Sequence, residues 1–314
     1  MVLEGKQGAL FDQMTADRRL PGRNSEDHHA LLSLIMFQSG RTVTAAAQQD
    51  HLANEFGKAM LQKHLEKEGH DDLLEYLPQL KITMNDGVID AIALHLSMYP
   101  LIGDMEMTLF FNATDEDFVT SDHPVTLCNN LPASSPHGAN TGISSRGLIL
   151  MYPLSPRVLL FLSDPEVYKV SSDANNVCTV KSTKDVINLN LPQCFNAHEN
   201  LYFASPEKVK GTLAAFEKHK EKLRAPRPGL VEAGALNQDG RKGVLLEMPA
   251  PSRRMILPGS VELRLAARRN KYAVGDTFIR DPVRRDVVRA ELDRIHKLRE
   301  AATAKADAAK AAAE

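Results

Sequence analysis

Apolar residues in the first hundred positions recur at three- and four-residue steps, which is the spacing of an amphipathic helix. Ser25 precedes two acidic residues, the pattern of a helix N-cap, so we expect a helix to begin there. Its apolar face carries Leu31, Leu34 and Ile35. Helical spacing continues over residues 45–67 and ends at Gly69, and another helix is predicted over residues 85–98, ahead of Pro100.

From residue 105 the pattern changes to short runs of branched and aromatic residues, which is typical of strands. Residues 105–111 and 118–120 are predicted as strands joined by an acidic turn. Residues 148–152 and 158–162 are predicted as a second pair with a tight, proline-containing connection. Residues 129–146, rich in Asn, Ser, Pro and Gly, are expected to form a long loop.

Two helix starts and several short strands are predicted in the rest of the chain. Ser182 begins a capping-box pattern, and Ser205 with Pro206 opens a helix that ends near Arg224. Short strand-like runs are residues 201–204, 244–248, 254–257 and 261–265.

These elements predict an α+β fold with N-terminal helices packed on a mixed or antiparallel sheet and a C-terminal helical extension. Residues 1–25 are polar and rich in Arg, Gly and Pro, and we expect them to be loosely ordered. Residues 26–224 would form the core domain. Residues 225–300 begin as a linker and continue as strand-like pieces and a basic helix, and residues 301–314 form an Ala-rich tail.

Composition narrows the class of protein. The 314 residues are 43% hydrophobic and 25% charged, which is typical of a globular protein. The apolar runs are much shorter than the roughly 20 residues that cross a bilayer, and no apolar signal region follows the start, so we expect a cytoplasmic protein without a membrane partner. The 3 cysteines form no C-x-x-C pair and are expected to be free.

Basic residues concentrate near the C-terminal end. Residues 251–300 hold 13 Lys and Arg against 7 Asp and Glu, although the net charge of the whole chain is −2. Such a region could contact phosphate backbones. Because few aromatic residues are interleaved and the acids suit helical ion pairs, nucleic-acid binding is the weaker interpretation.

Several segments, taken in order, resemble a bacterial family named domain of unknown function 4238. They are Leu-Leu-Ser-Leu-Ile-Met-Phe-Gln-Ser-Gly-Arg-Thr at 31–42, Phe-Val-Thr-Ser-Asp-His-Pro-Val at 118–125, Tyr-Pro-Leu-Ser-Pro-Arg at 152–157, and Val-Ile-Asn-Leu-Asn at 186–190 with residues 196–205. The resemblance covers about residues 30–205. Members of that family carry a His-x-x-Pro segment ahead of the first helix, and this sequence has no equivalent. The resemblance supplies motifs and implies no particular reaction.

The strand end at Thr120 leads into Ser121, Asp122, His123 and Pro124, where a carboxylate and an imidazole can converge in a turn. Asp122 and His123 are therefore candidate catalytic residues, as an acid/base pair or as ligands of a divalent metal. The alternative is that Asp122 only caps the turn by accepting backbone N–H groups.

Polar residues within apolar stretches are the candidate substrate-binding groups. Gln38 lies in the apolar stripe of the first helix and Arg41 lies at its edge, where a buried guanidinium needs an anionic partner. We expect Arg41 to contact Asp122, either as a structural clip or in a substrate site. Asn190 and Ser121 complete the set.

The functional hypothesis from the sequence is a hydrolase that acts on a phosphate-containing or nucleotide-like ligand. Arg41 would neutralise the anion, Asp122 and His123 would supply acid/base or metal-binding groups, and Asn190 would orient the substrate. The alternative is a non-catalytic binding or interaction protein in which the same residues brace the core. Phosphate-loop, zinc-protease and serine-elbow motifs are missing from the sequence.

The C-terminal tail allows a test from the sequence alone. Residues 301–314 have no apolar stripe, so deleting them should change the free energy of unfolding by less than about 0.5 kcal/mol. Truncation at Ile295 should destabilise much more, because Val287, Val288, Leu292, Ile295 and Leu298 recur at helical spacing and should dock. Thermal unfolding of both truncations distinguishes them, and equal shifts would show that the folded part ends elsewhere.

Overall fold

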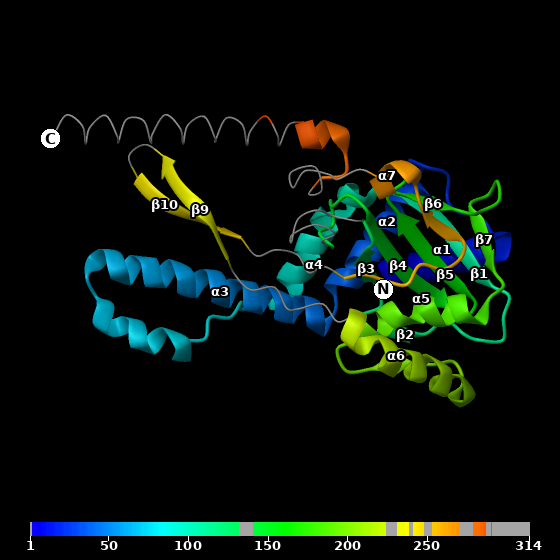
Figure 1. Cartoon of the computed structure of the whole chain (residues 1–314), viewed down its shortest axis with the longest axis horizontal. Helices are drawn as coiled ribbons and strands as arrows, with labels where there is room; N and C mark the ends of the chain where they lie inside the picture. Colours follow the sequence, from blue (N-terminus) through cyan, green and yellow to red (C-terminus); the bar gives the residue numbers. More distant parts are fainter. Residues whose placement is uncertain are drawn as a thin grey trace.

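The computed structural model describes residues 2–131, 141–223, 231–238, 241–247, 253–269, 279–286 and 290. Its centre is a five-stranded mixed sheet in the order β3-β4-β5-β1-β7 (Figure 1). The strands are β1 (Glu106–Asn112), β3 (Thr126–Asn129), β4 (Leu148–Ser155), β5 (Val158–Ser163) and β7 (Val177–Val180). Neighbouring strands are antiparallel except β1 and β7, which are parallel. The predicted α+β class is confirmed, with helical stretches also on the C-terminal side.

The sheet is buried on both faces, which explains why its strands read as continuous apolar runs. Successive residues of β4 and β5 alternate between two cores: Leu160 and Leu162 belong to one, and Leu159 and Phe161 to the other. Phe161 stacks on Phe110 of β1, with ring centroids 4.8 Å apart. Residues 148–163 are therefore the structural centre of the molecule.

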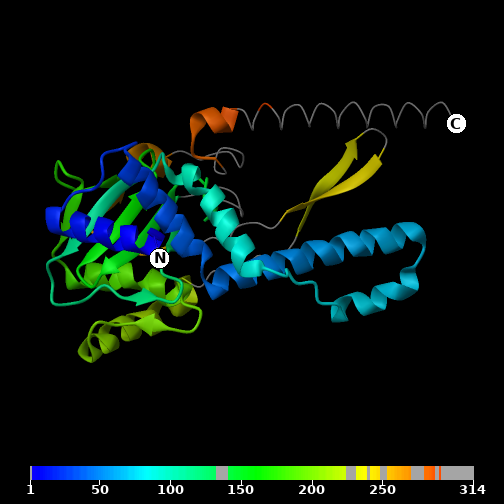
Figure 2. The same ribbon diagram turned by 180° about the vertical axis from the view of Figure 1, so that it is seen from behind.

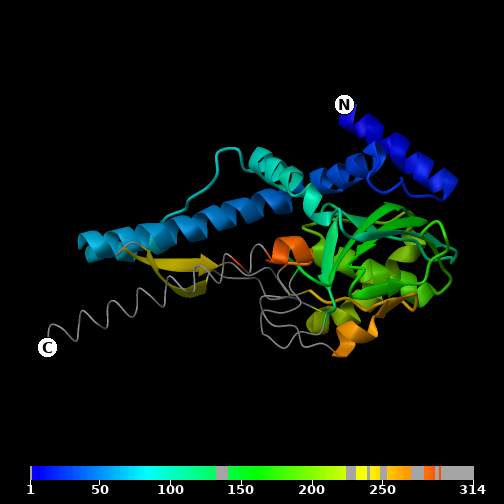
Figure 3. The ribbon, with the colours of Figure 1, turned by 90° about the horizontal axis from the view of Figure 1, so that it is seen from above.

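Helices α1 (Val2–Asp17) and α2 (Glu26–Gly40) cover one face of the sheet (Figures 2 and 3). Ser25 caps α2 as predicted, and its side chain accepts a hydrogen bond from the His28 N–H. Residues 2–17, which lie within the segment expected to be loosely ordered, form the helix α1. Leu10 and Met14, four residues apart, are buried against the sheet as part of α1, and Phe11 packs against the same core.

The other face is covered by α5 (Thr183–Asn196) and by the C-terminal segment that contains β11 (Val261–Leu263) and α7 (Leu265–Arg269). Ser182 caps α5 as the capping-box pattern predicts. A predicted strand at 254–257 is extended chain without ladder pairing. β11 pairs with β6 (Tyr168–Val170) and so adds a short ribbon outside the main sheet.

Two predicted connections differ in the structure. The strand predicted at 118–120 is β2 (Thr120–Ser121), which pairs with β8 (Leu201–Tyr202) and not with β1, so the acidic turn does not close a hairpin. Residues 231–238, predicted within the linker, form β9 (Val231–Gln238), which pairs with β10 (Arg241–Glu247). From β8 the chain continues through η3 (Pro206–Lys208) into α6 (Val209–Leu223). The Ala-rich tail lies outside the described residues.

An arm extends away from the sheet (Figures 1 and 3). It consists of α3 (Val43–Glu68) and η1 (Asp71–Gln79), and the chain returns to β1 through α4 (Gly87–Ser97), which packs on α2, and η2 (Tyr99–Ile102). α3 ends at Gly69 with a left-handed cap, as predicted. Side chains of α3 fasten the returning chain: Asn54 accepts the Ile82 N–H and Asp50 accepts the Met84 N–H.

A buried arginine ties the C-terminal segment to the core. Arg280 has 4% of its surface exposed and forms a bidentate pair with Asp104, with both N···O distances 2.8 Å. The same guanidinium donates to the carbonyl oxygens of Ser145 and Leu101. These contacts hold residue 280 against the loop that precedes β4 and the turn that precedes β1.

Asp104→Asn should therefore lower the free energy of unfolding by about 3 kcal/mol, because it leaves a buried guanidinium without its carboxylate. Urea denaturation measures the loss. Glu217→Gln, which breaks the exposed Lys220–Glu217 pair, is the matched control and should change stability by less than about 0.5 kcal/mol. Equal effects of the two variants would show that the Arg280 contacts contribute no more than a surface pair.

Candidate functional site

Asp122, the first of the predicted catalytic residues, follows β2 and caps a turn. Its carboxylate accepts hydrogen bonds from the backbone N–H groups of His198, Glu199 and Asn200 at 2.8, 2.8 and 3.0 Å. Burial alone would raise the pKa of Asp122, but these three donors together lower it. The carboxylate thus holds the chain between α5 and β8, the turn-capping alternative considered from the sequence.

Arg41 lies at the C-cap of α2, where its N–H donates to the carbonyl oxygen of Phe37. Its side chain is exposed, and the guanidinium carbon lies 5.6 Å from the centroid of the Phe37 ring. Among the ion pairs of the described residues, none joins Arg41 to Asp122, so the expected contact is absent. The reason is the helix end: α2 stops at Gly40, and Thr42, not Arg41, occupies the buried position.

The remaining predicted residues point into the protein. Asn190 accepts the Val119 N–H and donates to the Asp117 carbonyl oxygen and the Thr212 hydroxyl, so it fastens the chain before β2 to α5 and α6. Ser121 donates to Gln193 of α5 at 2.8 Å. Gln38 is buried, and its Oε1 has no hydrogen-bond partner among the residues that the structure describes.

Among the predicted site residues, His123 has the environment that is least typical of a residue with a purely structural role. It has 8% of its surface exposed, and its Nδ1 lies 2.8 Å from the Thr42 hydroxyl, which also caps α3. Burial and then the positive charges of Arg253 and His95 lower the pKa of His123 to about 4. The imidazole is therefore neutral at pH 7.

Arg253 is the member of this site that the sequence did not single out. Its guanidinium donates to Asn196 at 2.7 Å, and its carbonyl oxygen accepts the Asn129 N–H of β3. Asn196 donates in turn to the carbonyl oxygens of His123 and Val125. Burial lowers the pKa of Arg253, although a guanidinium stays protonated at neutral pH. Asn196 thus links the guanidinium of Arg253 to the backbone of His123.

His95, near the end of α4, adds a second histidine to this side of the molecule. Its Nδ1 lies 2.8 Å from the Ala91 carbonyl oxygen. A carbonyl oxygen only accepts, so Nδ1 carries the proton and, in the neutral ring, Nε2 is an acceptor. α4 packs closely on α2 here, because a Cβ on Gly40 would come within 2.9 Å of the Ala91 oxygen and of the His95 Cβ.

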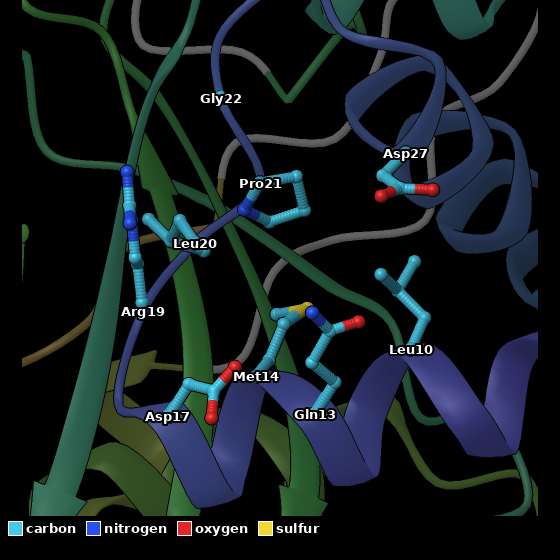
Figure 4. Close-up of a pocket in the computed structure, with 9 residues that line it drawn as sticks. All are labelled: Leu10, Gln13, Met14, Asp17, Arg19, Leu20, Pro21, Gly22 and Asp27. Carbon is cyan, nitrogen blue, oxygen red and sulfur yellow. The ribbon is translucent and has the colours of Figure 1, made fainter.

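A cavity of about 190 Å³ lies where α2, α4 and the sheet meet. His95 and Ser39 are its polar lining residues, and the rest of the lining is apolar. A second cavity, of about 220 Å³, lies between α1 and the start of α2 (Figure 4). Its polar groups are the exposed side chains of Gln13, Asp17, Arg19 and Asp27, so it is a surface groove above Leu10 and Met14.

The part of the chain that the structure describes holds no group of three or more His, Cys, Asp or Glu residues placed to bind a metal ion. Nor is any described helix long and apolar enough to cross a membrane. The three cysteines are free, as predicted. Burial raises the pKa of Cys128 to about 12 and that of Cys194 to about 11, so both thiols stay protonated at neutral pH.

The lowered pKa of His123 predicts a pH-dependent stability. An unfolded histidine takes up a proton near pH 6.5 and His123 in the folded state only near pH 4, so the unfolded state binds more protons between these values. Stability should therefore fall as the pH drops from 6.5 to 4, by up to about 3 kcal/mol from this group. His123→Gln should remove that part of the slope.

Urea denaturation at several pH values in this range provides the measurement. His64→Gln, at an exposed position of α3, is the control and should keep the slope of the unmodified chain. If His123→Gln and His64→Gln gave the same slope, His123 would not be held neutral by its surroundings.

Comparison with known proteins gives one match. The family model described as protein of unknown function (DUF4238) matches residues 1–207, which include α1 and therefore extend beyond the range expected from the motifs. No curated protein and no solved structure matches the chain. Because the matched residues make up well over half of the sequence, this chain belongs to the DUF4238 family.

Proposed function

We propose that this protein binds a phosphate-containing anion at the site formed by Arg253 and His123. The observation that carries the proposal is the environment of Arg253. Within the described residues this half-buried guanidinium forms no ion pair, and the one hydrogen bond that it donates goes to the uncharged amide of Asn196. A buried charge is costly unless it is paired, and a guanidinium has five N–H donors suited to phosphate oxygens.

The surrounding charges favour an anion. Arg253, a permanent cation, lowers the pKa of His123 more strongly than the Asp122 carboxylate raises it. The nearby carboxylate of Asp122 is engaged by three backbone N–H groups, so it is held on the turn and does not neutralise Arg253. In this proposal Arg253 takes the anion-binding role that the sequence suggested for Arg41.

Hydrolysis of the bound phosphate ester is the reaction that this site supports best, with His123 as the acid/base residue. The Thr42 hydroxyl lies 3.3 Å from the Ser39 carbonyl oxygen, to which it can donate. In that arrangement His123 Nδ1 donates to Thr42, and Nε2 is left as a proton acceptor. A neutral imidazole with a free Nε2 can take a proton from an attacking water.

A non-catalytic binding protein is the second candidate. It is favoured by the contacts of Asp122, Asn190 and Ser121, each of which holds one part of the backbone or one helix to another. In that case the site would bind the anion without turnover.

Binding of inorganic phosphate to the full chain, measured by isothermal titration calorimetry and by the shift in melting temperature, tests the proposal. Arg253→Met should lose at least tenfold in affinity, because it removes the only guanidinium that we assign to the anion. Arg268→Met, an exposed arginine of α7, is the matched control and should bind as the unmodified chain does. Equal affinities in the two variants, or no binding by the unmodified chain, would contradict the proposal.

Turnover separates the two candidates. An aryl phosphate should be hydrolysed by the unmodified chain, and His123→Gln should abolish hydrolysis while phosphate still binds. Binding of phosphate together with no hydrolysis in the unmodified chain would favour the non-catalytic alternative.

A further inference from the structure

The cavity of about 190 Å³ between α2, α4 and the sheet has no part in the proposed anion site, yet it adjoins that site. Its apolar lining consists of Met36, Met98, Val125, Leu127, Ile143 and Leu150. The volume somewhat exceeds the roughly 150 Å³ of an engineered apolar cavity that holds benzene. The space therefore suits one aromatic ring or a short branched chain.

Hydrogen bonds connect this cavity to the anion site through two routes. On one side, Asn196 accepts from Arg253 at 2.7 Å and donates to the carbonyl oxygen of Val125, a lining residue, at 3.0 Å. On the other side, the Thr42 hydroxyl that contacts His123 donates to the carbonyl oxygen of Ser39, which also lines the cavity. Asn196 and Thr42 therefore each contact a residue of the proposed anion site and a residue that lines the cavity.

The lining also selects against a charged or strongly polar occupant. Burying an unpaired polar group costs several kcal/mol, and the lining offers few polar partners beyond His95 and Ser39. An apolar group, by contrast, gains from leaving water in proportion to its buried area. The charged end of a ligand would therefore stay at Arg253 and the apolar end would enter the cavity.

We infer that the anion bound at Arg253 and His123 is the phosphate of a small organic phosphomonoester, whose aryl or short alkyl group occupies the cavity beside His95. The inference rests on the proposed function and names the substrate class of the same site. A free inorganic phosphate would fill only the charged half of the site. A nucleotide with its sugar and base exceeds the volume of the cavity.

The test compares phenyl phosphate with inorganic phosphate on the full chain by isothermal titration calorimetry. Phenyl phosphate should bind at least tenfold more tightly, because its ring leaves water. Ile143→Trp fills the cavity from a partly exposed position and should remove this preference while the affinity for inorganic phosphate stays unchanged. Leu213→Trp, on the partly exposed surface of α6, is the matched control and should keep the preference.

Leu127→Phe fills the same cavity from β3 and provides the comparison if Ile143→Trp does not fold. If inorganic phosphate binds but phenyl phosphate binds no tighter, the assigned substrate class is wrong and the anion site stands. If neither ligand binds, both proposals fail. A preference for phenyl phosphate that survives both cavity-filling variants would place the ring elsewhere and overturn the inference.

Discussion

The fold depends on burying both faces of one sheet. Successive residues of β4 and β5 belong to two different cores. Both faces of the sheet must therefore be shielded from water, and each face is covered by different elements. α1 and α2 supply one cover, and α5 with the C-terminal segment supplies the other. The C-terminal segment is therefore part of the folded core although the family match ends at residue 207. The Arg280–Asp104 pair and the pairing of β11 with β6 hold that segment in place.

The candidate site lies where these covers meet the sheet. Thr42 comes from the junction of α2 and α3, His123 from the turn between β2 and β3, Asn196 from the end of α5, and Arg253 from the C-terminal segment. Each is held by backbone contacts of its own element. Arg253 is held by the uncharged amide of Asn196 and not by a carboxylate, which is the property on which the proposed anion binding rests.

The sequence predicted the structure best where a local feature, such as a helix cap or a run of apolar residues, is enough to determine the element. Helix starts at Ser25 and Ser182 and the strand runs near 148 and 158 follow from caps and apolar patterns, and the structure confirms them. The helix α1 was missed because Leu10, Phe11 and Met14, which pack on the core, stand among glycines and charged residues. The local sequence does not reveal the buried face of α1, because that face is buried only when the helix packs on the sheet.

The site was harder to predict than the fold. His123 and Asp122 were found by their position in a turn, but the partner of an arginine depends on where a helix ends, and α2 ends one residue before Arg41. Arg253 lies 57 residues from Asn196 and is brought to it by the β3 contact. Nothing in the residues around position 253 distinguishes it from the other arginines of the basic region.

One consequence follows from the two roles of Thr42. Its hydroxyl caps the first turn of α3, the long helix of the arm, and the same oxygen contacts the imidazole of His123. At 1.5 Å of rise per residue, the 26 residues of α3 make a rod of about 39 Å with its inner end fixed at this threonine. A single side chain therefore fixes both the inner end of this rod and the imidazole of the candidate site.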